Sequence, residues 1–100
     1  MGWATPHIAK LAAGQTVSFR PRGGSMAGKI ESGQLCTVAP VRDPSTLKVG
    51  DIVLCKVNGF EYLHIVKAIR DGRFQIGNNR GGINGWIGPS HIYGLCIKVE

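Results

Sequence analysis

Negative charge is scarce in this sequence of 100 residues, which has six Asp and Glu against twelve Lys and Arg, a formal net charge of +6. Such an excess favours an acidic partner, for example a nucleic acid. The basic residues are scattered, however, and the densest group is only Arg20 and Arg22 with Lys29 beyond. The chain also lacks the mixture of basic and aromatic residues that stacks bases. Nucleic-acid binding is therefore possible but not favoured.

Long hydrophobic runs are absent as well. No apolar stretch approaches the ~20 residues that a helix needs to cross a bilayer. The first residues, Met1 to Pro6, lack the basic-then-apolar order of a secretory signal peptide. We therefore expect no membrane association and a cytoplasmic location.

Cysteine is limited to Cys36, Cys55 and Cys96, far apart and each within an apolar run. An odd number of cysteines without Cys-x-x-Cys spacing argues against a disulfide framework and against a zinc site. Buried, reduced thiols that act as small hydrophobic side chains are the simpler interpretation, and they fit a reducing compartment. We predict neither a metal nor a cofactor.

The length predicts a single domain over residues 1–100, with a helix or arm over 1–15 and a β-domain over 16–100. Only Ala4–Ala13 has helical character, because Thr5 can cap it, Pro6 suits a first turn and Gly14 would end it.

The rest of the chain predicts β-structure. Asn58-Gly59 is a strong signal for a two-residue hairpin, and Asp71-Gly72 predicts a second tight turn. A glycine-rich loop is expected from Gly77 to Gly88. The expected strands are 15–20, 34–41, 51–57, 60–69, 73–76 and 91–99. Short strands separated by frequent turns predict an all-β antiparallel barrel or rolled sheet with one short N-terminal helix.

Ser25 and His64 are the strongest candidates for chemistry. Ser25 follows Gly23-Gly24 in a predicted turn, and His64 lies on the strand expected over 60–69. A serine is a poor nucleophile until a neighbouring base takes its proton. Alternation along that strand puts His64 and Lys67 on opposite faces, so only one of them can meet Ser25 unless a bulge intervenes. The alternatives without chemistry are a turn serine and a histidine of the core.

A resemblance to a known family supports the first interpretation. Five segments occur in order, from Val17 to Val99, and together resemble the catalytic β-domain of LexA-type self-cleaving repressors and type I signal peptidases: Gly23-Gly24-Ser25-Met26, Gly50-Asp51-Ile52-Val53-Leu54, His64-Ile65-Val66-Lys67, Gly77-Asn78-Asn79 and Ile92-Tyr93-Gly94-Leu95.

The resemblance implies the rolled β-fold of that family, in a stand-alone, phage-type version, which places the protein in the host cytoplasm if it is phage-encoded. It also implies that Ser25 is the nucleophile and His64 the base, since archaeal and endoplasmic-reticulum signal peptidases use histidine where the others use lysine. A histidine with an ordinary pKa of about 6.5 is largely neutral near pH 7 and can accept a proton there.

Four further residues are predicted to form the oxyanion site or the cleft: Gly24, Met26, Asn78 and Asn79. Glycines before Ser25 would let a substrate carbonyl approach the Ser25 backbone N–H. The asparagines either line the substrate cleft or simply form turns.

The chain departs from the family in lacking a carboxylate between Asp71 and Glu100. A group that orients the imidazole would then be Asn78, Asn79 or Asn84, and an asparagine can orient the ring but cannot neutralise its cation.

Two functions follow from these residues. The first is a serine peptidase with a Ser25/His64 dyad, which hydrolyses an extended peptide or the chain itself, for example at Ala13-Gly14. The second is a catalytically silent module that uses the same cleft to sequester a host or regulatory protein. Either partner would bind as an added β-strand. The oligomeric state stays open, and a dimer is possible.

Overall fold

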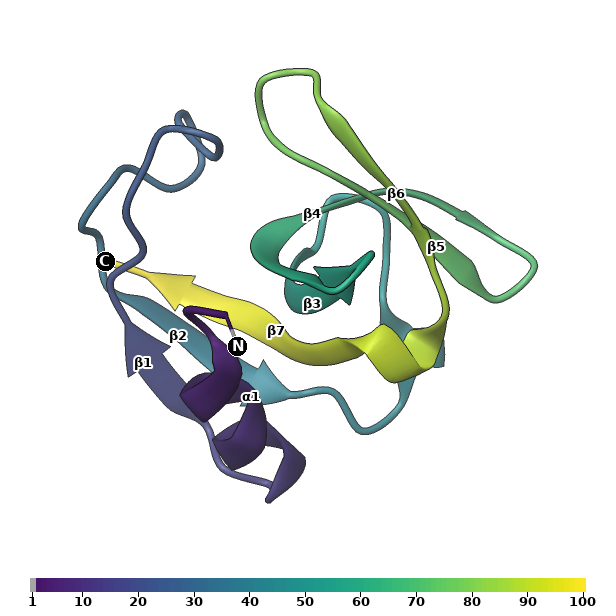
Figure 1. Ribbon diagram of the computed structural model, residues 1–100, viewed down its shortest axis with the longest axis horizontal. Helices are drawn as coiled ribbons and strands as arrows, with labels where there is room; N and C mark the ends of the chain where they lie inside the picture. The colour runs from purple at the N-terminus through teal and green to yellow at the C-terminus, as the bar shows by residue number, and fades with distance from the viewer. Residues whose placement is uncertain (1) are drawn as a thin grey trace.

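The computed structural model describes residues 2–100 and contains one seven-stranded antiparallel sheet in the order β1-β2-β7-β3-β4-β5-β6 (Figure 1). The elements are α1 (Thr5–Ala12), β1 (Val17–Phe19), β2 (Cys36–Pro40), η1 (Pro44–Thr46), β3 (Ile52–Val57), β4 (Phe60–Arg70), β5 (Arg73–Gly77), β6 (Ile83–Ile87), η2 (Pro89–His91) and β7 (Ile92–Val99). The sheet curls but does not close, because its two edge strands, β1 and β6, do not pair with each other. The predicted all-β rolled sheet with a short N-terminal helix is confirmed.

The turn chemistry of the sequence sets the two hairpins around β4. Asn58 and Gly59 both have positive φ, 52° and 83°, as a type I′ turn requires. Asp71 and Gly72 repeat this between β4 and β5, with φ of 52° and 71°. Both predicted turns are therefore present.

The prediction of a glycine-rich loop over 77–88 is wrong for the second half of that segment, which forms strand β6 (Ile83–Ile87) and pairs with β5. Gly85, with φ of +145°, interrupts the alternation of side chains that would have indicated a strand. The pairing with β5 overrides the weak strand propensity of a segment with glycine on both sides.

Two apolar clusters lie on the two sides of the central strands. One joins Leu11 of α1 to Leu54 of β3 and Leu63 of β4, and it includes Met26 and Ile30 from the connection between β1 and β2. The other gathers side chains from β3, β4, β5, β6 and β7: Val53, Cys55, Val57, Val66, Phe74, Ile76, Ile87 and Ile92, with Leu47 beside them. Strand β3 contributes alternate residues to both clusters, as expected for a strand covered on two faces.

Strand β4 changes partners along its length. Its first half, Phe60 to Ile65, pairs with β3, and its second half, Ile65 to Arg70, pairs with β5. A register shift between Val66 and Ala68 makes Lys67 a bulge residue.

Among residues 2–100, no helix is long and apolar enough to cross a membrane.

Candidate active site

Ser25 lies in the connection between β1 and β2, and its neighbours fix the connection to the body of the protein. Met26 is buried in the first apolar cluster, and its carbonyl accepts a hydrogen bond from Ile30 N at 2.8 Å. Gly24 O accepts from Ala27 N at 3.2 Å, which forms a tight turn around Ser25. The serine is therefore presented on a turn that an apolar side chain anchors.

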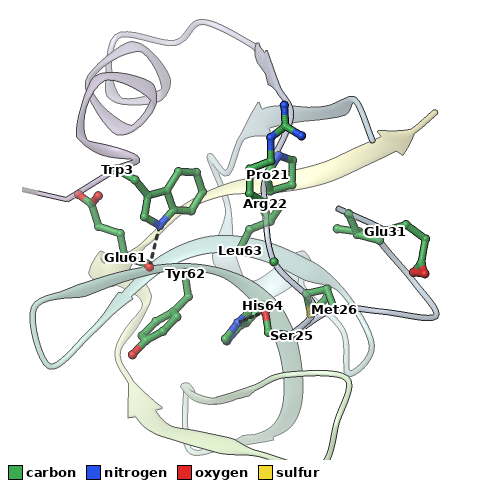
Figure 2. Close-up of a pocket in the computed structure, with 12 residues that line it drawn as sticks. Trp3, Pro21, Arg22, Ser25, Met26, Glu31, Glu61, Tyr62, Leu63 and His64 are labelled. Carbon is green, nitrogen blue, oxygen red and sulfur yellow. Dashed lines mark hydrogen bonds between the residues drawn. The ribbon is translucent and has the colours of Figure 1, made fainter. Parts of the chain in front are cut away.

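The Ser25 hydroxyl meets the His64 ring, as the sequence predicted. Ser25 Oγ lies 3.2 Å from His64 Nε2, and His64 Nδ1 lies 2.7 Å from Asn84 Oδ1. The two side chains lie next to each other at one end of the pocket in Figure 2. The Tyr62 ring stacks on the imidazole with centroids 4.7 Å apart and planes 25° from parallel, which limits tilting of the ring.

The contact with Asn84 selects one tautomer of His64. An amide oxygen can only accept a hydrogen bond, so Nδ1 carries the proton and donates it to Asn84 Oδ1. The lone pair of Nε2 then faces Ser25 and can accept the hydroxyl proton. This is the arrangement that a general base next to a serine needs.

The pKa of His64 is lowered from its ordinary value of 6.5. Burial causes the shift because it penalises the imidazolium, and the hydrogen bond to Asn84 opposes it. The ring is consequently neutral at pH 7 and available as a proton acceptor.

Asn84 reaches His64 because of a β-bulge between β5 and β6. Ile76 pairs with Gly85 and Gly77 pairs with Ile83, so Asn84 is the extra residue on β6. Such a bulge redirects a side chain out of the regular alternation. The sequence named Asn84 only as one of three alternatives, and it gave no signal for the bulge because β6 itself was missed.

The other two asparagines hydrogen-bond to groups other than His64. Asn79 N donates to Ser25 O at 2.9 Å, and Asn79 Nδ2 donates to Ala27 O at 2.8 Å. Asn79 therefore ties the turn that carries Ser25 to the end of β5. Asn78 Oδ1 accepts from the backbone N–H groups of Arg80 and Gly82, both at 2.8 Å, and forms the turn before β6.

Backbone N–H groups next to the Ser25 side chain have no hydrogen-bond partner among residues 2–100. In the described chain, the hydrogen bonds of this connection use the N–H groups of Gly23, Ala27 and Gly28 as donors, whereas those of Ser25 and Met26 donate to no described residue. Gly23, with φ of +110°, has nothing within 4 Å of the place where a Cβ would lie, so access from that side is open. Of the residues predicted to line the cleft, Met26 lines the pocket next to Ser25, whereas Gly24, Asn78 and Asn79 are outside its lining.

A pocket of about 330 Å³ adjoins the serine and the histidine (Figure 2). The buried side chains of Met26, Ile30 and Leu63 give it an apolar interior. Trp3, from the segment before α1, lines it from the other end and is 51% exposed. The sequence did not predict this contribution from the N-terminal segment.

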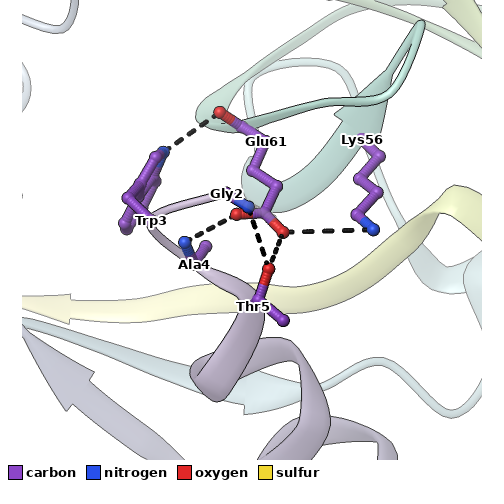
Figure 3. A network of polar contacts seen from close by, with 6 residues as sticks. All are labelled: Gly2, Trp3, Ala4, Thr5, Lys56 and Glu61. Carbon is purple, nitrogen blue, oxygen red and sulfur yellow. Dashed lines mark hydrogen bonds and ion pairs between the residues drawn. The ribbon is translucent and has the colours of Figure 1, made fainter.

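Glu61 fixes that segment to β4 (Figure 3). Its buried carboxylate accepts hydrogen bonds from Ala4 N and Thr5 Oγ1, both at 2.7 Å, and lies 4.0 Å from Lys56 Nζ. Burial raises the pKa of Glu61, but the hydrogen bonds from Thr5 and Ala4 and the charge of Lys56 together hold it below the ordinary 4.5. Trp3 Nε1 donates to the Glu61 carbonyl at 3.1 Å.

The cysteines take no part in the pocket. Burial raises the pKa of Cys55 to about 12 and that of Cys36 to about 11, so both thiols are protonated and unreactive at neutral pH. Within residues 2–100, no three side chains of His, Cys, Asp or Glu gather in a way that could hold a metal ion.

Comparison of the chain with protein-family models, with curated proteins and with solved structures gave no match. Any assignment of function consequently depends on the site geometry and on the sequence resemblance given above.

Proposed function

We propose that this protein is a serine peptidase-like enzyme that hydrolyses a peptide bond by acyl transfer. The observation that carries the proposal is the chain of contacts from Ser25 Oγ to His64 Nε2, at 3.2 Å, and from His64 Nδ1 to Asn84 Oδ1, at 2.7 Å. A nucleophile, a base in the required tautomer and a group that orients the base are the parts that this chemistry needs.

In the proposed reaction, Ser25 Oγ attacks the substrate carbonyl while His64 Nε2 takes the hydroxyl proton. The backbone N–H groups of Ser25 and Met26 would stabilise the negative oxygen of the tetrahedral intermediate. The imidazolium then gives its proton to the leaving amine, and a water molecule, activated by the same ring, hydrolyses the acyl-enzyme.

Asn84 fills the place of an acid in this scheme. It holds the imidazole in orientation, as an asparagine does in papain-like cysteine proteases, but it leaves the imidazolium without a counter-charge. We therefore expect a slow enzyme. The resemblance of the Ser25 and His64 segments to LexA-type and signal-peptidase domains agrees with the proposal.

The favoured substrate is a separate peptide rather than the Ala13–Gly14 bond. Ala13 and Gly14 line a different cavity, together with Arg42 and Tyr93, and not the pocket next to Ser25. Gly14 N also donates to Leu11 O at 2.9 Å, which keeps this segment in the turn that ends α1.

The test is covalent labelling with a fluorophosphonate, measured by intact-mass spectrometry and peptide mapping. We expect one adduct per chain, on Ser25, with no adduct in Ser25→Ala. The matched control is Ser18→Ala, because Ser18 is an exposed serine on β1 with a hydroxyl partner of its own, Thr37 at 3.1 Å. An adduct of equal extent in Ser25→Ala, or none in the parent protein, contradicts the proposal.

The second candidate function, a silent binding module, is favoured by one observation: an asparagine stands behind the imidazole instead of a carboxylate. Such a module would hold the same extended peptide in the same pocket. If this is the function, the parent protein and Ser25→Ala should bind peptides with the same affinity. Neither form should be labelled by the fluorophosphonate or cleave a peptide.

A further inference from the structure

The first half of β4 has an open edge next to Ser25. β5 pairs with β4 only from Ile65 onward, while β3 covers the other side from Phe60 to Ile65. Among residues 2–100, no strand pairs with Phe60 to His64 on the side opposite β3. The lining of the pocket on that side includes Glu61, Leu63 and His64.

The register identifies which backbone groups point to this edge. The type I′ turn at Asn58-Gly59 makes Val57 and Phe60 a hydrogen-bonded pair. Hydrogen-bonded and non-hydrogen-bonded pairs alternate along an antiparallel ladder. Glu61 and Leu63 are thus in non-hydrogen-bonded positions relative to β3, and their N–H and C=O groups point to the open edge.

One of these groups already has a partner. The Glu61 carbonyl accepts a hydrogen bond from the indole Nε1 of Trp3 at 3.1 Å, so a side chain occupies the place that a backbone N–H of an added strand would take. The indole also packs edge-on against Phe19, with ring centroids 5.5 Å apart. The segment that carries it is held by the buried Glu61 carboxylate through Ala4 N and Thr5 Oγ1.

We infer that Trp3 ends the peptide-binding edge and so limits the length of substrate that the site accepts. This inference rests on the proposed function for the nature of the ligand, an extended peptide. The peptide pairs with the N–H and C=O of Leu63, and the indole prevents the next pair from forming at Glu61. Successive outward-pointing positions on a strand are two residues, or about 7 Å, apart. The site consequently holds about two residues on the Trp3 side of the scissile bond.

The pocket also determines the class of side chain on that stretch. Its buried lining of Met26, Ile30 and Leu63 suits an apolar side chain, which enters next to the serine. The preferred ligand is therefore a short extended peptide segment with an apolar residue, bound mainly through main-chain hydrogen bonds.

The experiment measures binding as a function of peptide length in the Ser25→Ala background, so that cleavage is not needed for a result. Two series of alanine peptides with one central leucine are lengthened separately at the N- and C-terminal ends, and Kd is measured by calorimetry. The Leu63 amide is followed by ¹H–¹⁵N NMR. We expect a shift of the Leu63 amide, and in one series an affinity that stops rising after about two added residues.

Trp3→Phe keeps an aromatic ring and removes the indole N–H, while Trp3→Ala removes both. In both variants, the peptide series whose affinity stops rising in the parent should continue to gain affinity with length. We expect a gain of roughly three- to tenfold for the next pair of main-chain hydrogen bonds. Trp86→Phe is the matched control, because Trp86 lies on β6 under the Arg70 guanidinium and outside the pocket lining. It should keep the length limit of the parent.

Length profiles that are identical in the parent, Trp3→Phe and Trp3→Ala would overturn the inference, as would the absence of any binding or of any shift at Leu63. A failure of the proposed function would give a different result. Peptides that bind with the expected length limit but are never cleaved by the unsubstituted protein contradict the peptidase activity and leave the role of Trp3 supported.

Discussion

Strand β4 buries two titratable side chains, Glu61 and His64, each only 7% exposed, and their surroundings give them opposite charge states. Glu61 is met by two hydrogen-bond donors and by the Lys56 ammonium, which stabilise the carboxylate. His64 is met by a hydroxyl and an amide oxygen, neither of which is charged, so burial keeps the ring neutral.

The difference lies in which groups each buried side chain contacts. Both hydrogen-bond donors to the Glu61 carboxylate come from the N-terminal segment, so the carboxylate joins that segment to the sheet. His64 instead keeps a lone pair directed at a hydroxyl on a turn that is open to a ligand. Equal burial on the same strand therefore does not indicate equal function; the chemistry of the partners does.

The largest expected effect is on the His64 side of the comparison. His64→Gln removes the proton acceptor, and we expect labelling and cleavage to fall by at least about 10³-fold, the scale seen when a member of a serine triad is removed. His91→Gln is the matched control, since His91 is exposed on η2. Pseudo-first-order labelling rates measure the effect, and equal rates in the two variants would exclude His64 as the base.

The next largest effect concerns Glu61 and stability. Glu61→Ala leaves the buried Ala4 N–H without its acceptor and frees the Thr5 hydroxyl, so we expect the free energy of unfolding to fall by about 2 kcal/mol. Urea unfolding followed by circular dichroism measures it.

Glu61→Gln keeps one acceptor oxygen at the same position and should lose less stability than Glu61→Ala. The same stability for both variants and the parent would show that the carboxylate does not hold the N-terminal segment. By contrast, Ser25→Ala should unfold at nearly the same urea concentration as the parent, because its hydroxyl serves the site and not the fold.

Asn84→Asp would make the two regions more alike by placing a carboxylate next to His64. A negative charge at the position of Asn84 Oδ1, 2.7 Å from Nδ1, would stabilise the imidazolium and raise the pKa of His64. We expect the labelling rate at pH 8 to rise by about tenfold, which corresponds to ~1.4 kcal/mol of additional stabilisation of the transition state. Asn78→Asp is the control, because Asn78 serves a turn. A lower rate in Asn84→Asp would contradict the role given to this residue.

The smallest expected effect is the dependence on pH, which should differ between the two regions. The pKa of folded His64 is lowered from 6.5 by burial, so labelling should be fastest near pH 8 and should decrease as pH falls through the folded pKa, where the ring becomes protonated. In Asn84→Asp this decrease should begin at higher pH. A labelling rate that rises as the pH falls from 8 would exclude His64 as the base.

Both groups affect stability on the acid side, in different pH windows. His64 destabilises the folded state as pH falls below 6.5, since the unfolded chain takes up the proton first. Glu61, with a pKa below 4.5, contributes stability that is present above pH 4.5 and is lost as pH falls through its folded pKa. The free energy of unfolding of Glu61→Gln, of His64→Gln and of the parent, measured between pH 3 and pH 8, distinguishes the two contributions.

Local sequence patterns predicted most of the fold, and together with the family resemblance they named Ser25 and His64 as candidates, which the structure places 3.2 Å apart. Alternating apolar residues gave the long strands, and the Asn58-Gly59 pair gave the hairpin that sets the register of β4. That register in turn decides that His64 faces Ser25. Strand β6 was missed because its central glycine and a neighbouring bulge break the alternation on which such predictions depend.

The sequence by itself determined the all-β character, the turns, and the serine and histidine as candidates, because each of these depends on neighbours in the chain. Only the tertiary structure decided which asparagine orients the imidazole, since Asn84 is redirected by a bulge that exists only when β6 pairs with β5. It also decided that Trp3 lines one end of the pocket. That contact joins residues 58 positions apart and depends on a buried carboxylate whose partners no local pattern reveals.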